Sequence, residues 1–215
     1  MENRQKTDEL ERISYPSESA QEDMEQIQEC LKGNWKAFEK LYNKYKDKVF
    51  YIAYRYVHQK EEAMDIVQDV FTKVYNSLHK FEGRSSFYTW LCRITINRSI
   101  DVTRTKKSTI SYESFMQEDD SNKKERKPEE SLPIDQIRDQ EFRNAFDKAL
   151  DKLPEIHKSV FVLYALENLS YKDIAEVLDI SIGTVMSRLH YARKKLQSQL
   201  ADWYPQSSHQ EGMHE

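Results

Sequence analysis

Helix-breaking residues are almost absent from the apolar parts of this chain. The 215 residues include only four glycines and five prolines, so long stretches run without a residue that interrupts a helix. Within these stretches apolar side chains recur every three or four positions, which is the period of an amphipathic helix. We therefore expect an all-α fold made of two small helical domains joined by a flexible acidic linker.

The first domain is expected over residues 23–105, after a disordered N-terminal extension at residues 1–22. A short helix over about residues 23–32 ends at Gly33, and Asn34 can cap the next helix. The apolar positions of that long helix are Trp35, Phe38, Leu41, Tyr42, Tyr45, Val49, Ile52, Ala53 and Tyr56. Two further helices follow over about residues 61–78 and 87–104, separated by a loop that contains Gly83.

The second domain is expected over residues 136–200. Residues 106–135 before it are rich in Ser, Asp, Glu and Lys and lack an apolar period, so we interpret them as the flexible linker. One helix is expected over about residues 141–152, and Pro154 suits the first position of a helix that continues to about Asn168. We interpret residues 201–215 as a disordered tail.

Residues 169–196, LSYKDIAEVLDISIGTVMSRLHYARKKL, predict a helix-turn-helix. Ser170 and Asp173 form a capping box for the first helix, and Ser181 can cap the second. The second helix carries basic side chains and no acidic one, so it suits the major groove of DNA. The residues expected to meet DNA are Gly183, Thr184, Ser187, Arg188, Tyr191 and Arg193, the last through the phosphate backbone. A solvated basic face on an ordinary helix is the alternative.

Charge is unevenly distributed along the chain, so the net charge of −4 does not argue against nucleic-acid binding. Residues 31–107 carry 16 basic and 8 acidic side chains, whereas residues 1–30 carry 3 and 9. Within the basic part, residues 81–107 interleave Phe81, Phe87, Tyr88 and Trp90 with arginines and lysines. Aromatic rings can stack on unpaired bases while cations follow the backbone. Packing of these rings in the domain core is the alternative.

Three segments together resemble one family. DIVQDVF (65–71), FEGRSSFYTWLCRITINRSID (81–101) and the helix-turn-helix segment are similar, in this order, to the extracytoplasmic-function sigma factors of bacterial RNA polymerase, in the sigma-70 family. The resemblance covers about residues 24–105, as region 2, and about 136–200, as region 4. It implies a subunit that binds core RNA polymerase, recognises the −35 promoter element as duplex, and recognises and helps to melt the −10 element.

The resemblance also implies roles for individual residues. The residues expected to bind −10 DNA are Phe81, Arg84, Trp90, Arg93 and Asn97. Phe81 and Asn97 match positions that bind a flipped-out −10 base, which a ring and an amide can read, and Trp90 and Arg93 match residues next to the melting junction. Those that match the surface binding the polymerase clamp are Asp65, Gln68, Asp69 and Phe71. Ser187 and Arg188 match −35 contact positions. Solvated charges on an amphipathic helix are the alternative for Asp65 and Asp69.

The chain departs from the family's pattern at three positions. Cys92 stands where an aromatic residue is common, and Met186 and Tyr191 stand where basic residues are frequent. A lost cation weakens a phosphate contact or changes the base preference. The promoter sequence is therefore not specified by the resemblance.

Partners and chemistry follow from the same residues. We expect no cofactor, no metal site and no catalysis, because the histidines lack metal-ligand spacing and no nucleophile lies beside a base. Two cysteines without a CxxC, no signal peptide and no apolar run of membrane-spanning length favour a cytoplasmic protein without membrane insertion. The resemblance implies an anti-sigma factor as inhibitory partner and a monomer when active.

Two other classes of protein fit part of the sequence. A repressor or activator with a helical sensing domain would use the same helix-turn-helix, but as a dimer on a palindrome and without a strand-binding segment. An adaptor that binds only proteins would leave the basic second helix unexplained.

Overall fold

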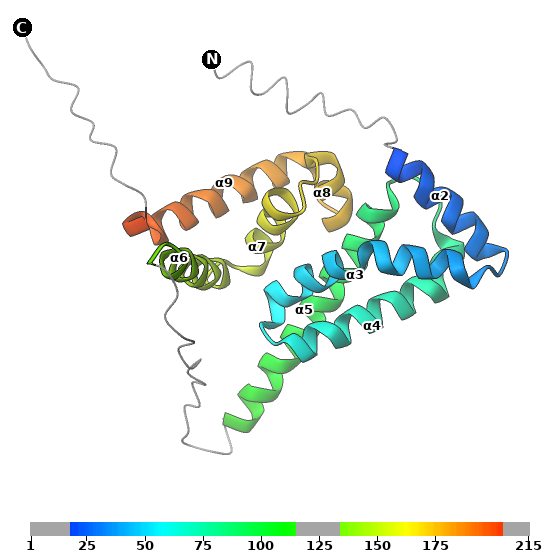
Figure 1. Cartoon of the computed structure of the whole chain (residues 1–215). Helices are drawn as coiled ribbons and strands as arrows, with labels where there is room; N and C mark the ends of the chain where they lie inside the picture. The colour runs from blue at the N-terminus through cyan, green and yellow to red at the C-terminus, as the bar shows by residue number, and fades with distance from the viewer. Residues whose placement is uncertain (1–17, 115–133, 204–215) are drawn as a thin grey trace, which may run out of the picture.

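The structure, a computed structural model, describes residues 18–114 and 134–203, and the regular elements within these two ranges are helical (Figure 1). The first domain consists of α2 (Glu18–Leu31), α3 (Trp35–Val57), α4 (Lys60–Ser77), the short η1 (Leu78–Lys80) and α5 (Phe87–Ser114). The second domain consists of α6 (Ile134–Asp151), α7 (Glu155–Phe161), the π-helical η2 (Val162–Leu166), α8 (Tyr171–Leu178), α9 (Ile182–Gln199) and η3 (Ala201–Trp203). The all-α architecture with two helical domains is confirmed.

Local capping explains where several helices begin. The Asn34 side chain accepts a hydrogen bond of 3.2 Å from the Lys36 backbone N–H, as its N-cap position predicts. Gly33 before it has φ of +89°, a conformation that costs glycine little. Ser170 Oγ and Ser181 Oγ each accept a backbone N–H three residues ahead, from Asp173 and Thr184, at 3.1 Å. The predicted N-caps of the helix-turn-helix are therefore confirmed.

Most apolar positions of α3, α4 and the first half of α5 face one another and form the core of the first domain. Val49, Ala63, Val74 and Leu91 are completely buried there. In the second domain α6, α7 and α9 enclose a separate cluster around Leu150, Val162 and Ala192. Burying an aliphatic side chain contributes about 1.5–3 kcal/mol, so these periodic positions provide most of the stability of each bundle.

Several predicted boundaries differ from the structure. Helix α2 begins at Glu18, inside the predicted extension 1–22, because Asp23 and Ile27 anchor it on the bundle, both nearly buried. Helix α5 continues to Ser114 instead of ending near Arg104, because polar residues without an apolar period can still extend an existing helix. The first nine residues of the predicted linker, 106–114, are therefore helical.

In the second domain α6 already begins at Ile134, and Pro154 is the N-cap of α7 rather than its first residue. Helix α7 then gives way to a π-helical turn, which the apolar period did not predict. Residues 201–203 of the predicted tail form a 3₁₀ turn. The predicted flexibility of residues 115–133 and disorder of residues 1–17 and 204–215 concern segments outside the described residues.

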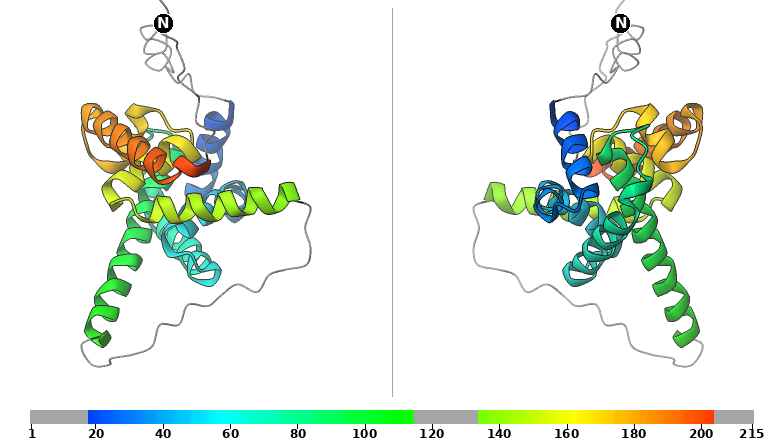
Figure 2. Two further views of the ribbon diagram at one scale, coloured as in Figure 1. Left: turned by 90° about the vertical axis from the view of Figure 1, so that its left-hand side faces the viewer. Right: turned by 90° about the vertical axis from the view of Figure 1, so that its right-hand side faces the viewer.

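The two domains pack against each other. Helix α8 lies against α5, and one continuous set of buried apolar residues runs from α3 and α5 into α7, α8 and α9 (Figures 1 and 2). It joins Leu91 and Cys92 of the first domain to Leu163, Ile174 and Val177 of the second. The last turns of α5 extend away from this body (Figure 2). The sequence predicted two domains, but not that they share a core.

Candidate functional site

One exposed stripe of α5 carries three of the predicted −10 residues. Trp90, Arg93 and Asn97 are spaced by three and four, so they lie on the same face of the helix. Arg93 and Asn97 are exposed, and Trp90 is half-buried. The opposite face of α5 packs in the core through Leu91 and Thr95. An amide and a cation are thereby held on a rigid helix with their polar groups available to a ligand.

Phe81 joins this stripe from the loop before α5. Its ring is 5.3 Å from that of Trp90 and 5.9 Å from that of Phe87, in tilted and edge-to-face arrangements. Phe87 is 2% exposed and anchors the cluster, whereas Phe81 and Trp90 remain half-buried. Phe87 is therefore a core residue, as the packing alternative expects. Phe81 and Trp90 keep an accessible side, and their stacking on a base stays a prediction. Arg84 is exposed and pairs with Glu82 at 2.6 Å.

The helix-turn-helix presents most of its predicted residues on the outer side of α9. Val185 and Leu189 are buried, while Ser187 is exposed and Thr184 and Arg188 are half-buried. A Cβ added to Gly183 would meet only Ser181 Oγ, at 3.9 Å, so the space at the start of α9 is open. This geometry suits approach of a phosphate to the first backbone N–H groups of the helix.

Tyr191 and Arg193 are held by aromatic neighbours. The Tyr191 ring stacks on His157 at 4.1 Å, and the His157 Nδ1 lies 3.3 Å from the carbonyl oxygen of Arg188. The Arg193 guanidinium lies 4.8 Å from the centre of the Tyr164 ring. These contacts fix α9 on α7 and η2. The Arg193 side chain remains exposed, and the sequence did not predict its contact with Tyr164.

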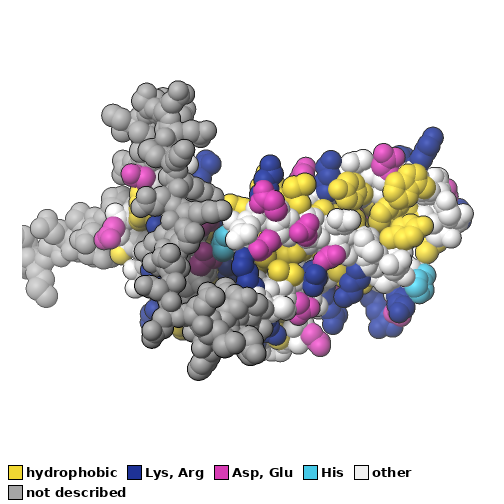
Figure 3. Space-filling view, turned by 90° about the horizontal axis from the view of Figure 1, so that it is seen from below, with side chains coloured by type: hydrophobic (Ala, Val, Ile, Leu, Met, Phe, Trp, Pro, Cys, Tyr) yellow, Lys and Arg dark blue, Asp and Glu magenta, His cyan; other side chains and the backbone are white. Residues whose placement is uncertain are grey.

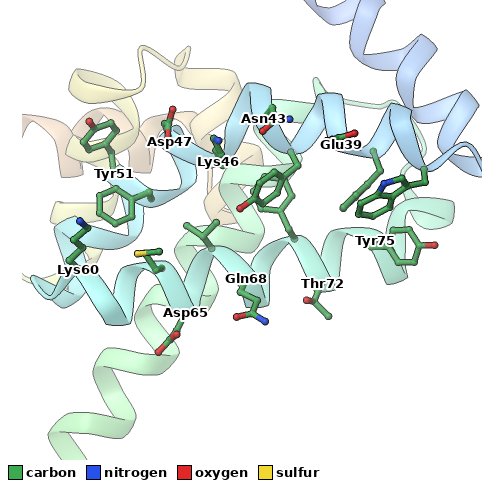
Figure 4. Close-up of a pocket in the computed structure, with 17 residues that line it drawn as sticks. Glu39, Asn43, Lys46, Asp47, Tyr51, Lys60, Asp65, Gln68, Thr72 and Tyr75 are labelled. Atoms are coloured by element: carbon green, nitrogen blue, oxygen red, sulfur yellow. The ribbon is translucent and has the colours of Figure 1, made fainter.

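A long groove between α3 and α4 contains three of the four residues predicted to bind polymerase (Figure 4). Asp65 and Gln68 lie along its α4 wall, and Phe71, at 4% exposed, forms part of its floor. The groove encloses about 1080 Å³, enough for several side chains of a partner. Asp69 lies outside it and pairs with Arg98 of α5 at 2.6 Å. Asp69 therefore remains an exposed charge on the surface, with Arg98 as its partner.

Exposed aromatic and methionine side chains border the groove, and the sequence did not single them out. Trp35, Tyr51, Met64 and Tyr75 are each more than half exposed. Trp35 and Tyr42 are two of the apolar positions predicted for the long helix, and they lie on this open surface. The periodicity carries no signal for this exposure, because Trp35 shares its helical face with Ala53, 18 residues later, and Ala53 is completely buried. Seen from below, apolar side chains gather where α3 begins and α4 ends (Figure 3).

Two further observations concern other kinds of site. In the described ranges, 18–114 and 134–203, His, Cys, Asp and Glu side chains form no group of three that could hold a metal ion. Among the helices of these ranges, none is both long and apolar enough to pass through a lipid bilayer.

Two family models match the chain, one in each of the two domains. The family described as Sigma-70 region 2 matches residues 41–109, and the family described as Sigma-70, region 4 matches residues 143–196. The RNA polymerase sigma-H factor of Pseudomonas aeruginosa is 34% identical over 187 residues, covering 84% of this chain and 94% of the relative. The ECF RNA polymerase sigma factor SigW of Bacillus subtilis is 34% identical over 178 residues, covering 82% and 95%.

Solved structures resemble the fold over most of the chain. The sigma factor RpoE in complex with the anti-sigma factor NepR, from Bartonella quintana, matches with a TM-score of 0.59 and 25% identity, over 77% of this chain and 98% of that one. CnrH in complex with the cytosolic domain of CnrY matches with a TM-score of 0.63 and 24% identity, over 84% and 98%. The latter likeness concerns the fold alone.

Proposed function

Because the chain belongs to the extracytoplasmic-function sigma factors of the sigma-70 family, we propose that it binds core RNA polymerase and directs it to specific promoters. It initiates transcription as a recognition subunit, and the chemistry of RNA synthesis belongs to the polymerase. The first domain is the region 2 unit and the second domain is the region 4 unit. A repressor and a protein-binding adaptor both lose support, since neither needs the two units in this order.

The −10 element is the proposed ligand of the exposed stripe on α5. A base that has left the duplex can stack on Phe81 or Trp90 while the Asn97 amide reads its Watson–Crick edge. Arg93 lies between them and can pair with the strand's phosphate. The combination of half-open rings with an exposed amide on one helical face is the observation that carries this proposal.

The −35 element is the proposed ligand of α9. Its outer residues would enter the major groove of duplex DNA, with Ser187 and Arg188 toward the bases. The groove between α3 and α4 is the proposed polymerase-binding surface. Its aromatic and methionine border is typical of a protein interface, where Tyr, Trp and Met are enriched.

An anti-sigma factor is the proposed inhibitory partner, as in the complex of RpoE with NepR. Such a partner would cover polymerase-facing or DNA-facing surfaces and keep the chain from transcription. The active form is proposed to be a monomer, because one copy carries both DNA-binding surfaces.

Transcription from a promoter library with purified core polymerase, with and without this chain, tests the proposal. The expected result is initiation at a defined subset of promoters only when the chain is present. The Arg188→Ala variant serves as a control, since it should lose promoter selection while still binding core polymerase. Identical transcripts with and without the chain would contradict the proposed function.

A further inference from the structure

The first turns of α9 carry no charged side chain. Residues 182–187 read IGTVMS, and the basic side chains of this helix begin only at Arg188. In a helix-turn-helix, the N-terminal residues of the second helix are those that contact base edges. Ahead of Arg188, α9 would therefore meet the bases with uncharged groups, without the guanidinium or ammonium group that usually reads guanine.

The hydroxyl groups in these turns are engaged within the helix. Ser187 Oγ donates to the Thr184 carbonyl oxygen at 3.0 Å. Thr184 Oγ1 lies 2.8 Å from Ser181 Oγ, and Ser181 Oγ also accepts the Thr184 backbone N–H at 3.1 Å. Ser187 can still accept a hydrogen bond from a base, but its one proton is already donated to the helix. The hydroxyls therefore provide few ways to distinguish one base pair from another.

Two apolar side chains of the same turns are exposed to water. Ile182 and Met186 are 44% and 46% exposed, whereas Val185, on the inner side of α9, is completely buried. A spacing of four residues places Ile182 and Met186 on one face of the helix, and Met186 directly precedes Ser187. Contact of these side chains with an apolar group of a ligand would be favourable, because it removes apolar surface from water.

The major groove of DNA offers one such apolar group. Thymine presents its C5-methyl group there, and adenine, guanine and cytosine present none. Methionine is unbranched and has three rotatable bonds, so its thioether end can adapt to the position of a methyl group. Met186 also stands where basic residues are frequent in the family, so the base that relatives read at this position does not carry over to this chain.

We propose that Met186, with Ile182 beside it, contacts the methyl group of a thymine in the −35 element. This chain then prefers a T·A pair at that position, where a basic side chain would favour guanine. The inference deepens the proposed function, which provides the duplex as the ligand of α9. Arg188 makes its own contact to the duplex and does not depend on the methyl group.

Replacement of thymine by deoxyuridine tests the proposal, because it removes the methyl group alone and keeps the base pair. Each thymine of the −35 element, on either strand, is replaced in turn in a promoter that the chain selects from the library. A duplex with a scrambled −35 element measures binding without recognition. Affinities are measured by competition, with the full-length chain assembled on core polymerase.

Four forms of the chain are compared, namely the wild type, Met186→Ala, Met186→Leu and Arg188→Ala. Met186 is exposed, so neither substitution at this position removes a core contact, and circular dichroism checks that the helices are retained. Leucine keeps an apolar side chain of similar size, whereas alanine is too short to reach the methyl group. Arg188→Ala is the matched control, since it removes a contact of the same helix that is not apolar.

We expect one deoxyuridine to weaken wild-type binding about fourfold, equivalent to the loss of about 0.8 kcal/mol for one buried methyl group. Met186→Ala should bind the thymine and deoxyuridine duplexes with equal affinity, and Met186→Leu should keep part of the ratio. Arg188→Ala should bind both duplexes more weakly and keep the fourfold ratio.

Three results would overturn the proposal. They are a wild type that binds every deoxyuridine duplex as well as the parent, a fourfold ratio that persists in Met186→Ala, and a selected −35 element without thymine on either strand. Failure of the proposed function gives a different pattern. In that case the assembled complex would bind the scrambled duplex as tightly as the parent, and the inference would fall with the function.

Discussion

Replacement of Asn97 by alanine separates promoter melting from folding. The Asn97 side chain is exposed on α5, and the core residues beside it, Ile94 and Ile96, are unaffected by its truncation. Alanine is the better helix former by up to about 0.7 kcal/mol, so the free energy of unfolding should stay equal or rise slightly. The amide's proposed contact to a base edge is worth about 1–3 kcal/mol, which corresponds to a loss of about 5- to 150-fold in binding of the melted strand.

The assay is the rate of open-complex formation with core polymerase, followed by a fluorescent base in the −10 element. Asn76→Ala on α4 is the matched control, since it makes the same substitution at an exposed helical position away from the stripe. Binding of −35 duplex should be unchanged in both variants. If Asn97→Ala melted the promoter at the wild-type rate, Asn97 would not be the residue that reads the −10 base. A large loss of protein stability would show that Asn97 supports the fold instead.

Four further predictions concern other parts of the molecule. Arg188→Ala should weaken −35 duplex binding by about 1–3 kcal/mol in a gel-shift titration. The domain should stay folded, because His157 contacts the backbone carbonyl of Arg188 and not its side chain. An equal loss of polymerase binding would point to misfolding. Met64→Ala should lower the affinity for core polymerase about tenfold in a pull-down titration. The melting temperature of the protein should hardly change, since Met64 is 55% exposed in the groove. An unchanged affinity would show that the groove is not part of the interface. Leu189→Ala should lower the free energy of unfolding by about 2–5 kcal/mol in chemical denaturation, because Leu189 is 1% exposed between the helices of the helix-turn-helix. A change below about 1 kcal/mol would be inconsistent with that packing. Burial alone would raise the pKa of Asp151, but hydrogen bonds from His58 and Lys158 hold this pKa below its ordinary value. The contribution of Asp151 to stability is therefore present above the unfolded-state pKa and is lost as the pH falls through the lower folded-state pKa. The difference in unfolding free energy between wild type and Asp151→Asn should therefore shrink on going from pH 7 to pH 3, and a difference that grows would show the opposite sign.

The sequence by itself determined the helices and the beginnings of several of them. The spacing of Leu41, Val49 and Ile52 makes one apolar face, and the Asn34, Ser170 and Ser181 caps act within three residues of themselves. Such signals are local, so they can be read without knowing the fold. The exposed stripe on α5 could also be predicted from the sequence, because Trp90, Arg93 and Asn97 share a face in any helix.

The groove could be predicted only in part. Asp65 and Gln68 were singled out by resemblance, but the exposure of Trp35 and Tyr42 was not predicted, because helical spacing does not say which apolar side chains a neighbouring helix covers. Their exposure depends on how α3 and α4 pack against each other. The end of α5 was missed for a related reason, because polar residues extend a helix that the core has already started.

Only the tertiary structure decided how the two domains meet. Arg104 and Glu155 are 51 positions apart, and Tyr88 and Glu167 are 79 apart, so no local pattern links them. Each carboxylate alone looks like a solvated charge in the sequence. The apolar packing of α8 on α5 brings these side chains together. That packing depends on the fold of the whole chain and is not encoded within one helix.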